Sequence, residues 1–487
     1  MSASWGFTTR QLHAAATPEP VTGALAPPIF QTTAYAFPDP DSAAARFDGR
    51  EAGFTYSRLN NPTVLALEER VAALEGGASA VAVASGQAAV AYALATLAGQ
   101  GDHIVASSAL YGGTRTLLSE GFARRGTEVG FVAGDAAPDA WAAAIGPKTK
   151  ALFVESIANP GGQIADLAAL AHVAHGAGLP LVVDNTVATP YVTRPIEWGA
   201  DVVVHSASKY LSGHGTVIAG VIVDAGAFDF GLATQRFADF NRPVVGFDDL
   251  VLARDFGAGG GRGRAGVNES YIVKVRLEQL HDFGACLAPF NAFLTIQGLE
   301  TLSLRMDRHL SNAQAVAEFL VQRRSGGIGA DVGTGAEPSA ATGPATGAAT
   351  GAASGAASGA VPGEEADPAA VTTVTYSGLP TSPFHELARR YAPKGPGGIV
   401  AFDLAGGEPA ARAFVGGLRL HSHVANIGDV RSLAIHPGST THGQISPQSQ
   451  REAGVRPGTV RLSVGIEDVE DILEDLELGF AAARRLA

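Results

Sequence analysis

The sequence contains a single cysteine, Cys286, among 487 residues. One thiol excludes an internal disulfide framework and a cysteine-based zinc cluster, and it fits the reducing conditions of a cytoplasm. The surrounding residues, DFGACLAPF, have the pattern of a packed helix. We therefore expect Cys286 to be a small buried hydrophobic residue rather than a nucleophile.

Positive charge is also scarce, because 34 lysine and arginine residues stand against 47 acidic residues. This balance argues against nucleic acid or an anionic membrane as a partner. The N-terminus shows no basic segment followed by an apolar core, and the apolar stretch 78–99 is interrupted by Ser-Gly-Gln. Such a stretch suits a strand, a turn and a helix better than a membrane span, so we expect a cytoplasmic protein.

Short apolar runs alternate with stretches of helix length through the first half of the chain. Alanine- and leucine-rich stretches such as 87–102 and 164–180 predict helices. The alternation indicates a large, mostly parallel α/β sheet, which binds ligands at the carboxyl ends of its strands. The runs typical of strands buried on both faces are residues 79–85, 103–108, 128–133, 151–156, 181–186 and 201–208.

The pattern changes near residue 266, where long helical stretches begin. We expect an N-terminal arm at residues 1–60, a large sheet domain at residues 61–265 and a smaller C-terminal domain at residues 266–487. Residues 326–368 are rich in alanine and glycine and low in complexity. Such a segment buries too little apolar surface to offset the entropy of ordering it, so we interpret it as a flexible inserted loop.

One lysine, Lys209, lies among small hydroxyl and glycine residues in the stretch HSASKYLSGHGT, at the end of a predicted strand. A lysine in this position can form a Schiff base with a carbonyl cofactor. A surface lysine in a turn explains this motif equally well. Residues at other strand ends must decide between the two interpretations.

Residues at the ends of other predicted strands favour a pyridoxal phosphate site. Asp184 ends one strand, where a carboxylate can hold the protonated ring nitrogen and keep the ring an electron sink. Tyr111 follows another strand, where its ring can stack on the pyridine. A strand-to-helix turn with free N–H groups suits the phosphate, and the residues of this turn and the hydroxyls beside the lysine are Ser85, Gly86, Gln87, Ser206 and Ser208.

Nine motifs along the chain carry a family resemblance. They resemble, in the same order, those of the Cys/Met-metabolism family of pyridoxal-phosphate enzymes, and the O-acetylhomoserine sulfhydrylase branch is the most similar. The resemblance implies a fold-type I transferase, with a large mostly parallel sheet domain and a smaller α+β C-terminal domain. The motifs are YSRLNNPT, ASGQAA, LYGGT, ESIANPGG, DNTVATPY, SASKYLSGHGT, GLETLSLRMDRH, SLAIHPGSTTH and VRLSVGIED.

The resemblance implies γ-replacement, in which sulfide or a thiol displaces acetate from O-acetyl-L-homoserine to give homocysteine or methionine. Lys209 would hold the cofactor and move protons at the substrate carbons. Asp184 would pair with the ring nitrogen, and Asn159 would contact the ring hydroxyl. Tyr111 would stack on the ring and assist the leaving group.

The family also implies how the charged ends of cofactor and substrate are held. Arg461, with the backbone at Ser432, would bind the substrate α-carboxylate, a role that suits the planar fork of arginine. The protein would be a homo-oligomer, a dimer of dimers, in which one subunit completes the site of another. The phosphate ligands would be Gly86, Gln87, Ser206 and Ser208, joined by Tyr56 and Arg58 of a neighbouring subunit.

Several alternatives stay open. The chain can be a methionine or cystathionine γ-lyase, an O-succinylhomoserine sulfhydrylase, or a binding protein of this fold that has lost catalysis. In the methionine γ-lyase branch a cysteine is typical two residues after the stacking tyrosine, where this chain has Gly113. His421 and His423 have no neighbouring carboxylate or cysteine set, so we expect no metal site.

Overall fold

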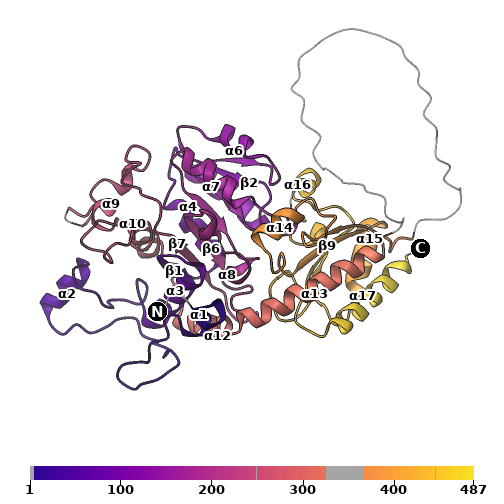
Figure 1. The fold of residues 1–487 in the computed structure, drawn as a ribbon, viewed down its shortest axis with the longest axis horizontal. Helices are drawn as coiled ribbons and strands as arrows, with labels where there is room; N and C mark the ends of the chain where they lie inside the picture. Colours follow the sequence, from indigo (N-terminus) through magenta and orange to yellow (C-terminus); the bar gives the residue numbers. More distant parts are fainter. Residues whose placement is uncertain (1–4, 248, 325–366, 445, 487) are drawn as a thin grey trace, which may run out of the picture.

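Two β-sheets organise the protein. The computed structural model describes residues 5–247, 249–324, 367–444 and 446–486. Figure 1 shows one body coloured indigo to magenta and a second coloured orange to yellow, with the long helix α13 (Leu302–Gln322) running from the first to the second. Among the described residues, no helix is both long and apolar enough to cross a membrane.

The first sheet has seven strands in the order β1-β7-β6-β5-β4-β2-β3. Strands β2 to β6 pair in parallel, whereas β7 is antiparallel to both β6 and β1. The mostly parallel sheet and its six predicted strands are confirmed, and β7 is a further strand. The bounds are β1 (Ser79–Val83), β2 (His103–Ser107), β3 (Glu128–Val132), β4 (Thr149–Glu155), β5 (Leu181–Asp184), β6 (Val202–Ser206) and β7 (Gly220–Asp224).

Helices cover both faces of this sheet, which explains why its strands are apolar throughout. Along β4, Leu152 and Val154 pack in the core that includes α3 and α7, whereas Ala151 and Phe153 pack in the core that includes α4. The helices of this body are α1 (Phe7–His13), α2 (Pro40–Phe47), α3 (Pro62–Glu75), α4 (Gly86–Ala95), α5 (Gly112–Thr116), α6 (Pro138–Ala144), α7 (Leu167–Gly176), α8 (Thr189–Val192), α9 (Leu252–Asp255), α10 (Ser270–Lys274), α11 (His281–Phe283) and α12 (Pro289–Leu299).

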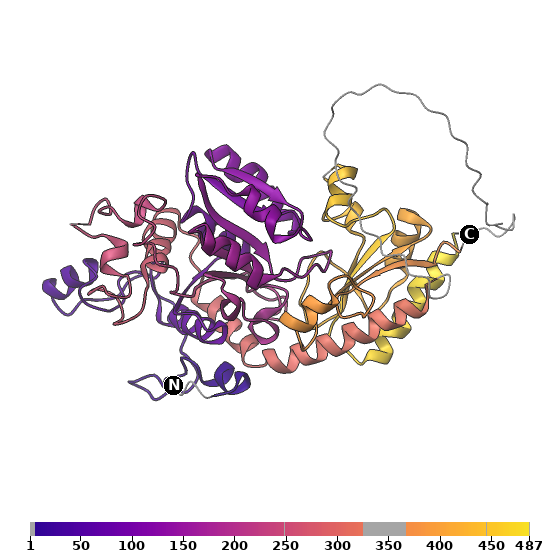
Figure 2. The same ribbon diagram turned by 45° about the horizontal axis from the view of Figure 1, so that its top comes forward.

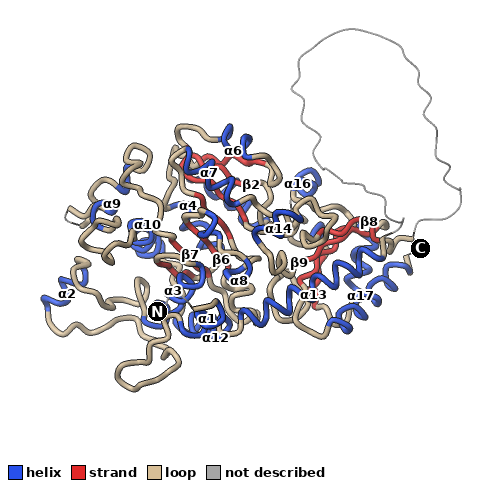
Figure 3. Tube along the Cα trace, in the orientation of Figure 1, coloured by secondary structure: helices blue, strands red, loops and turns tan. Residues whose placement is uncertain are grey.

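The second sheet has five strands in the order β10-β11-β12-β9-β8. Its pairs are antiparallel except β10 with β11, and Figure 3 shows it as a separate group of strands. Helices α13, α15 and α17 lie together along it in Figure 2, which confirms a smaller α+β unit. The bounds are β8 (Val371–Thr375), β9 (Ile399–Leu404), β10 (Ser422–His423), β11 (Leu433–Ile435), β12 (Thr459–Ser463), α14 (His385–Tyr391), α15 (Gly407–Gly417), α16 (Pro447–Glu452) and α17 (Val469–Arg484).

The segment predicted as an insert lies mostly outside the described residues, which resume at residue 367. The chain on its two sides comes together, because Arg324 and Val371 form an isolated parallel bridge. Leu320 and Val371 are fully buried in one core. The end of α13 and the start of β8 therefore lie side by side in the fold, although residues 326–368 separate them in the sequence.

Two helices that follow residue 266 pack against the first sheet. Tyr271 and Val275 lie in the core that includes α4, and Ile296 lies in the core that includes α3. A boundary at α13 fits this packing better than one at residue 266. The division into an arm and two domains stays a prediction.

Cys286 is exposed, so the expectation of a buried residue in a packed helix is wrong. The helical stretch ends because Gly284 and Ala285 adopt φ values of 80° and 51°. The chain then runs extended, and Cys286 forms an isolated antiparallel bridge with Val83 at the edge of the first sheet. Pairing with the edge strand satisfies backbone hydrogen bonds of this segment but leaves the Cys286 thiol exposed.

Candidate active site

A cavity of about 500 Å³ opens where β4, β5 and β6 end, and residues 425–427 of the second body close one side of it. This is the strand edge at which parallel α/β sheets bind ligands. Its volume suits a small-molecule site. Predicted site residues that line it are Ser85, Gly86, Gln87, Tyr111, Asn159, Asp184, Ser206, Ser208, Lys209 and Arg461.

The turn between β1 and α4 forms one wall. Ser85 caps α4, and its hydroxyl accepts a hydrogen bond from the N–H of Ala88 at 3.1 Å. A Cβ on Gly86 would lie 2.4 Å from the Cβ of Ser206, so only glycine lets the helix start approach β6 this closely. The first N–H groups of α4 and the hydroxyl of Ser206 suit an anion such as a phosphate. The hydroxyl of Ser208 instead donates to the carbonyl of Ala219 at 3.2 Å and accepts from the N–H of that residue at 2.9 Å.

Lys209 follows β6 in a tight turn and reaches across to the second body. Its Nζ donates a hydrogen bond to Oδ1 of Asn426 at 2.5 Å. Burial, and then the charge of Arg461, lower the pKa of the Lys209 amine. A larger share of this amine is therefore neutral at a given pH, as a nucleophile or a base requires.

Asp184 ends β5 and lies opposite Glu155 of β4 in the sheet register. Its Oδ1 accepts hydrogen bonds from the N–H and the hydroxyl of Thr186, at 3.0 and 2.5 Å. Burial raises the pKa of Asp184, and the two hydrogen bonds oppose that rise. A protonated ring nitrogen beside this carboxylate would favour its ionised form.

Tyr111 lies at the start of α5, where its side chain is half exposed at 48%. A Cβ on Gly113 would lie 2.5 Å from Cε1 of the Tyr111 ring, so the ring occupies space that any larger residue would take. Gln87 supports the same turn by donating from Nε2 to the carbonyl of Gly113 at 2.8 Å. The absence of a side chain at Gly113 therefore leaves the space that the tyrosine ring occupies.

Arg461 projects from β12 and is buried, with 5% of its surface exposed. Its guanidinium donates to Oδ1 of Asn159 at 3.3 Å and to the carbonyl of Asn426 at 3.0 Å, while Nε has no partner in the described chain. None of the described carboxylates forms an ion pair with it, and burial lowers its pKa to about 10. A buried cation with a spare donor suits an anionic ligand group.

Three predicted site residues do not line the cavity. Ser432 donates its N–H and hydroxyl to Glu467 at 2.6 and 2.9 Å, which occupies both groups. Tyr56 is exposed, and Arg58 lies over its ring and donates to the carbonyl of His281. Roles for Tyr56 and Arg58 in a neighbouring subunit stay a prediction.

The sequence interpretation missed several polar residues of the cavity: Thr114, Glu155, Thr186, Asn426 and Thr441. Glu155 and Thr186 stand inside quoted motifs, directly at strand ends, and that position was the available signal. Asn426 lies in a loop of the second body, and no strand-end motif in the sequence marks its position.

The donor set fits pyridoxal phosphate. The anion-binding turn suits the phosphate, and Asp184 and Tyr111 suit the ring. Lys209 offers an amine for the aldehyde. The spare Nε of Arg461 shows that room and charge remain for a substrate carboxylate in the same cavity.

Comparison with known proteins indicates the same cofactor. A family model described as "Cys/Met metabolism PLP-dependent enzyme" matches residues 8–325 and 364–481. The O-acetyl-L-homoserine sulfhydrylase of Corynebacterium glutamicum is 41% identical over 481 residues, 98% of this chain and 97% of the relative. That of Leptospira meyeri is 42% identical over 470 residues, 96% of this chain and 95% of the relative.

Solved structures confirm the predicted fold class. A putative O-acetylhomoserine (thiol)-lyase from Campylobacter jejuni superposes with a TM-score of 0.83 at 34% identity, over 98% of this chain and 100% of that one. That crystal structure contains a lysine carrying the pyridoxyl phosphate group. The metB protein of Corynebacterium glutamicum superposes with a TM-score of 0.74 at 31% identity, over 98% of each chain.

The lowered pKa of Lys209 gives a pH prediction for cofactor attachment. The cofactor-free protein should take up pyridoxal phosphate on Lys209 with a pH midpoint below 10.5, the ordinary lysine value. Arg461→Gln removes one of the two causes, so the midpoint should move upward. Borohydride reduction followed by peptide mass spectrometry across a pH series measures it.

Arg456→Gln is the matched control, because Arg456 precedes β12 and its guanidinium pairs with Asp403 at 2.8 Å. This variant should leave the midpoint where it is in the parent protein. An unchanged midpoint in Arg461→Gln, or an adduct on another lysine, would contradict the assignment.

Proposed function

The chain belongs to the Cys/Met metabolism family of pyridoxal-phosphate-dependent enzymes, and from that premise we propose that it replaces the acetate of O-acetyl-L-homoserine by sulfide or a thiol. The products are acetate and L-homocysteine, or methionine when the thiol is methanethiol. The observation that carries the proposal is one cavity that contains both the Lys209 amine and the buried guanidinium of Arg461. An amino acid bound by its carboxylate at Arg461 has its α-carbon within the same cavity as the amine.

Pyridoxal phosphate, when bound, supplies an electron sink for the charge left after proton removal from the substrate. The protein supplies the bases, the acids and the binding contacts. Lys209 would accept a proton from Cα, pass it to the bound cofactor, and, as a neutral amine again, accept one from Cβ, which would allow acetate to leave from Cγ. Sulfide would add at Cγ, and Lys209 would give a proton back to Cβ and later to Cα. A proton is restored at each carbon, so the net reaction exchanges acetate for the thiol.

The contacts of the site favour these roles. The lowered pKa of Lys209 makes its amine a competent base. Asn426 accepts from Nζ of Lys209, which holds the amine when it is not bonded to a ligand. Tyr111 stands at the cavity wall, where its hydroxyl can protonate the departing acetate.

The position of Gly113 favours replacement over γ-cleavage of a thioether. A cysteine there, as is typical of methionine γ-lyases, would collide with the Tyr111 ring, since even its Cβ would lie 2.5 Å from Cε1. Glycine also leaves room beside the ring for an incoming sulfur nucleophile. A methionine or cystathionine γ-lyase, or an O-succinylhomoserine sulfhydrylase, is the alternative.

Assembly into a homo-oligomer, a dimer of dimers, is part of the proposal. Tyr56 and Arg58 lie outside the cavity of their own subunit, although the resemblance assigns both to a phosphate. The N-terminal arm that holds them exposes apolar side chains, among them Val21 at 88%, Leu25 at 77% and Phe47 at 63%. A second copy that covers them would bring Arg58 to its partner's site. We propose a cytoplasmic location, in keeping with the single cysteine.

The choice of reaction can be measured directly. O-acetylhomoserine with sulfide should give homocysteine with a kcat/KM at least about tenfold above that for methionine cleavage, a gap of about 1.4 kcal/mol in transition-state binding. Gly113→Cys should narrow this gap by slowing sulfhydrylation, because the Tyr111 ring must move. Comparable or faster release of α-ketobutyrate and methanethiol from methionine would place the protein among the lyases.

Mixed subunits test the shared site. Lys209→Ala and Arg58→Ala subunits, each inactive alone, should recover part of the activity in hybrids, because one site in each pair receives both intact groups. Hybrids of Lys209→Ala with Arg461→Ala are the control and should stay inactive, since both residues line one cavity. No recovery in verified Arg58 hybrids would place Arg58 in its own subunit's site or away from the cofactor.

A further inference from the structure

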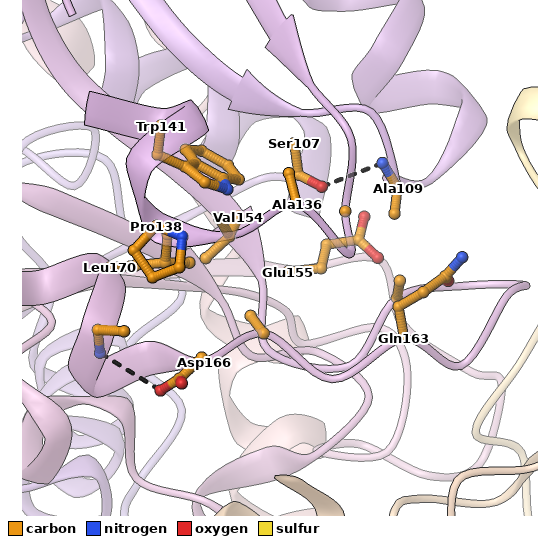
Figure 4. Close-up of a pocket in the computed structure, with 14 residues that line it drawn as sticks. Ser107, Ala109, Ala136, Pro138, Trp141, Val154, Glu155, Gln163, Asp166 and Leu170 are labelled. Atoms are coloured by element: carbon orange, nitrogen blue, oxygen red, sulfur yellow. Dashed lines mark hydrogen bonds between the residues drawn. The ribbon is translucent and has the colours of Figure 1, made fainter. Parts of the chain in front are cut away.

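Glu155 forms part of the wall between two cavities. It lines the active-site cavity and also a second cavity of about 40 Å³ under β4. That volume holds a few water molecules at about 10–15 Å³ each. Figure 4 shows Glu155 near Ser107 and Gln163 at one end of the small cavity, with Trp141 and Leu170 at the other.

The carboxylate of Glu155 fixes two main-chain segments of the active site. Oε1 accepts a hydrogen bond from the N–H of Tyr111 at 2.6 Å, and Oε2 accepts one from the N–H of Asn159 at 3.1 Å. These are the residues expected to stack on the cofactor ring and to contact its hydroxyl. Two loops that follow different strands are thus tied to one side chain.

The cost of burying Glu155 indicates that these contacts matter. Glu155 has 7% of its surface exposed, and it lies opposite Asp184, which carries another buried carboxyl group. Burial, and then the charge of Asp184, raise the pKa of Glu155 well above its usual range. In the described chain Glu155 forms no ion pair, so the two backbone N–H donors of Tyr111 and Asn159 are what stabilise its carboxyl group.

We propose that Glu155 is a positioning residue, a clamp that fixes the backbones of Tyr111 and Asn159 and thereby aligns both side chains with the cofactor. The inference rests on the proposed function, since it assigns Glu155 to the same reaction. Glu155 touches neither substrate nor cofactor in this role. It acts through the two residues that do.

The test compares holoenzyme variants. Glu155→Gln keeps the volume and one acceptor oxygen, but its amide N–H₂ cannot accept from a backbone N–H. We expect kcat for O-acetylhomoserine and sulfide to fall about tenfold or more, because small misplacements of aligned groups are costly. KM should change less than about threefold, since Arg461 still binds the carboxylate.

A spectroscopic readout separates alignment from stability. The induced circular dichroism of the bound cofactor's visible band reports how the ring is held, and it should weaken in Glu155→Gln at an unchanged cofactor content. Ser107→Ala is the control, because the Ser107 hydroxyl borders the same small cavity and, among the residues that the structure describes, accepts only from the N–H of Ala109, at 3.1 Å. This control should retain the parent kcat and dichroism.

Either of two results would overturn the proposed role of Glu155. The first is a kcat of Glu155→Gln equal to that of the parent enzyme. The second is a kcat that falls only in proportion to the loss of folded protein, while the dichroism of the bound cofactor is unchanged. Should Glu155→Gln not fold, Glu155→Asp keeps the carboxylate but shortens its reach, and parent-like kcat there would also overturn it. If the parent enzyme does not convert O-acetylhomoserine, the proposed function fails, while the dichroism comparison still decides the role of Glu155.

Discussion

The guanidinium of Arg461 is a charge that the fold buries without pairing it to a carboxylate of the described chain. It comes from the second sheet and donates to Asn159 on the first body and to the carbonyl of Asn426 on the second. Its cost in desolvation is offset only in part by these neutral acceptors. A substrate carboxylate bound to Arg461 would neutralise this charge. The same contact would place the substrate beside Lys209.

The opposite edge of the cavity holds two carboxyl groups whose pKa values are raised by burial. Asp184 and Glu155 end neighbouring parallel strands, so the sheet itself brings two carboxyls together. Hydrogen bonds from Thr186 support the anion at Asp184, and the backbone N–H groups of Tyr111 and Asn159 support Glu155. The cavity thus offers the Asp184 carboxyl group to the ring nitrogen and the Arg461 guanidinium to the substrate carboxylate, and the Lys209 amine lines the same cavity.

Local patterns in the sequence predict much of this architecture. The β-branched runs predict six strands of the first sheet, and the strand-end motifs predict most of the cavity wall. Asn426 could not be predicted in this way, because it lies in a loop 217 residues after Lys209 and contacts the lysine only in the folded protein. Ser432, which was expected to bind the substrate carboxylate, instead hydrogen-bonds to Glu467. Cys286 was misjudged because two positive φ angles, which a helix-like pattern does not reveal, end the helix before it.

Proton movement at two substrate carbons is the central claim of the account. Running the reaction of O-acetylhomoserine with sulfide in heavy water, and locating deuterium in the homocysteine by mass spectrometry and NMR, tests it most directly. We expect deuterium at both Cα and Cβ, because Lys209 removes a proton from each carbon and its N–H protons exchange with the heavy water before one is returned. Homocysteine labelled at Cα alone, or not at all, would contradict it, since sulfide would then displace acetate from Cγ without proton removal at Cβ.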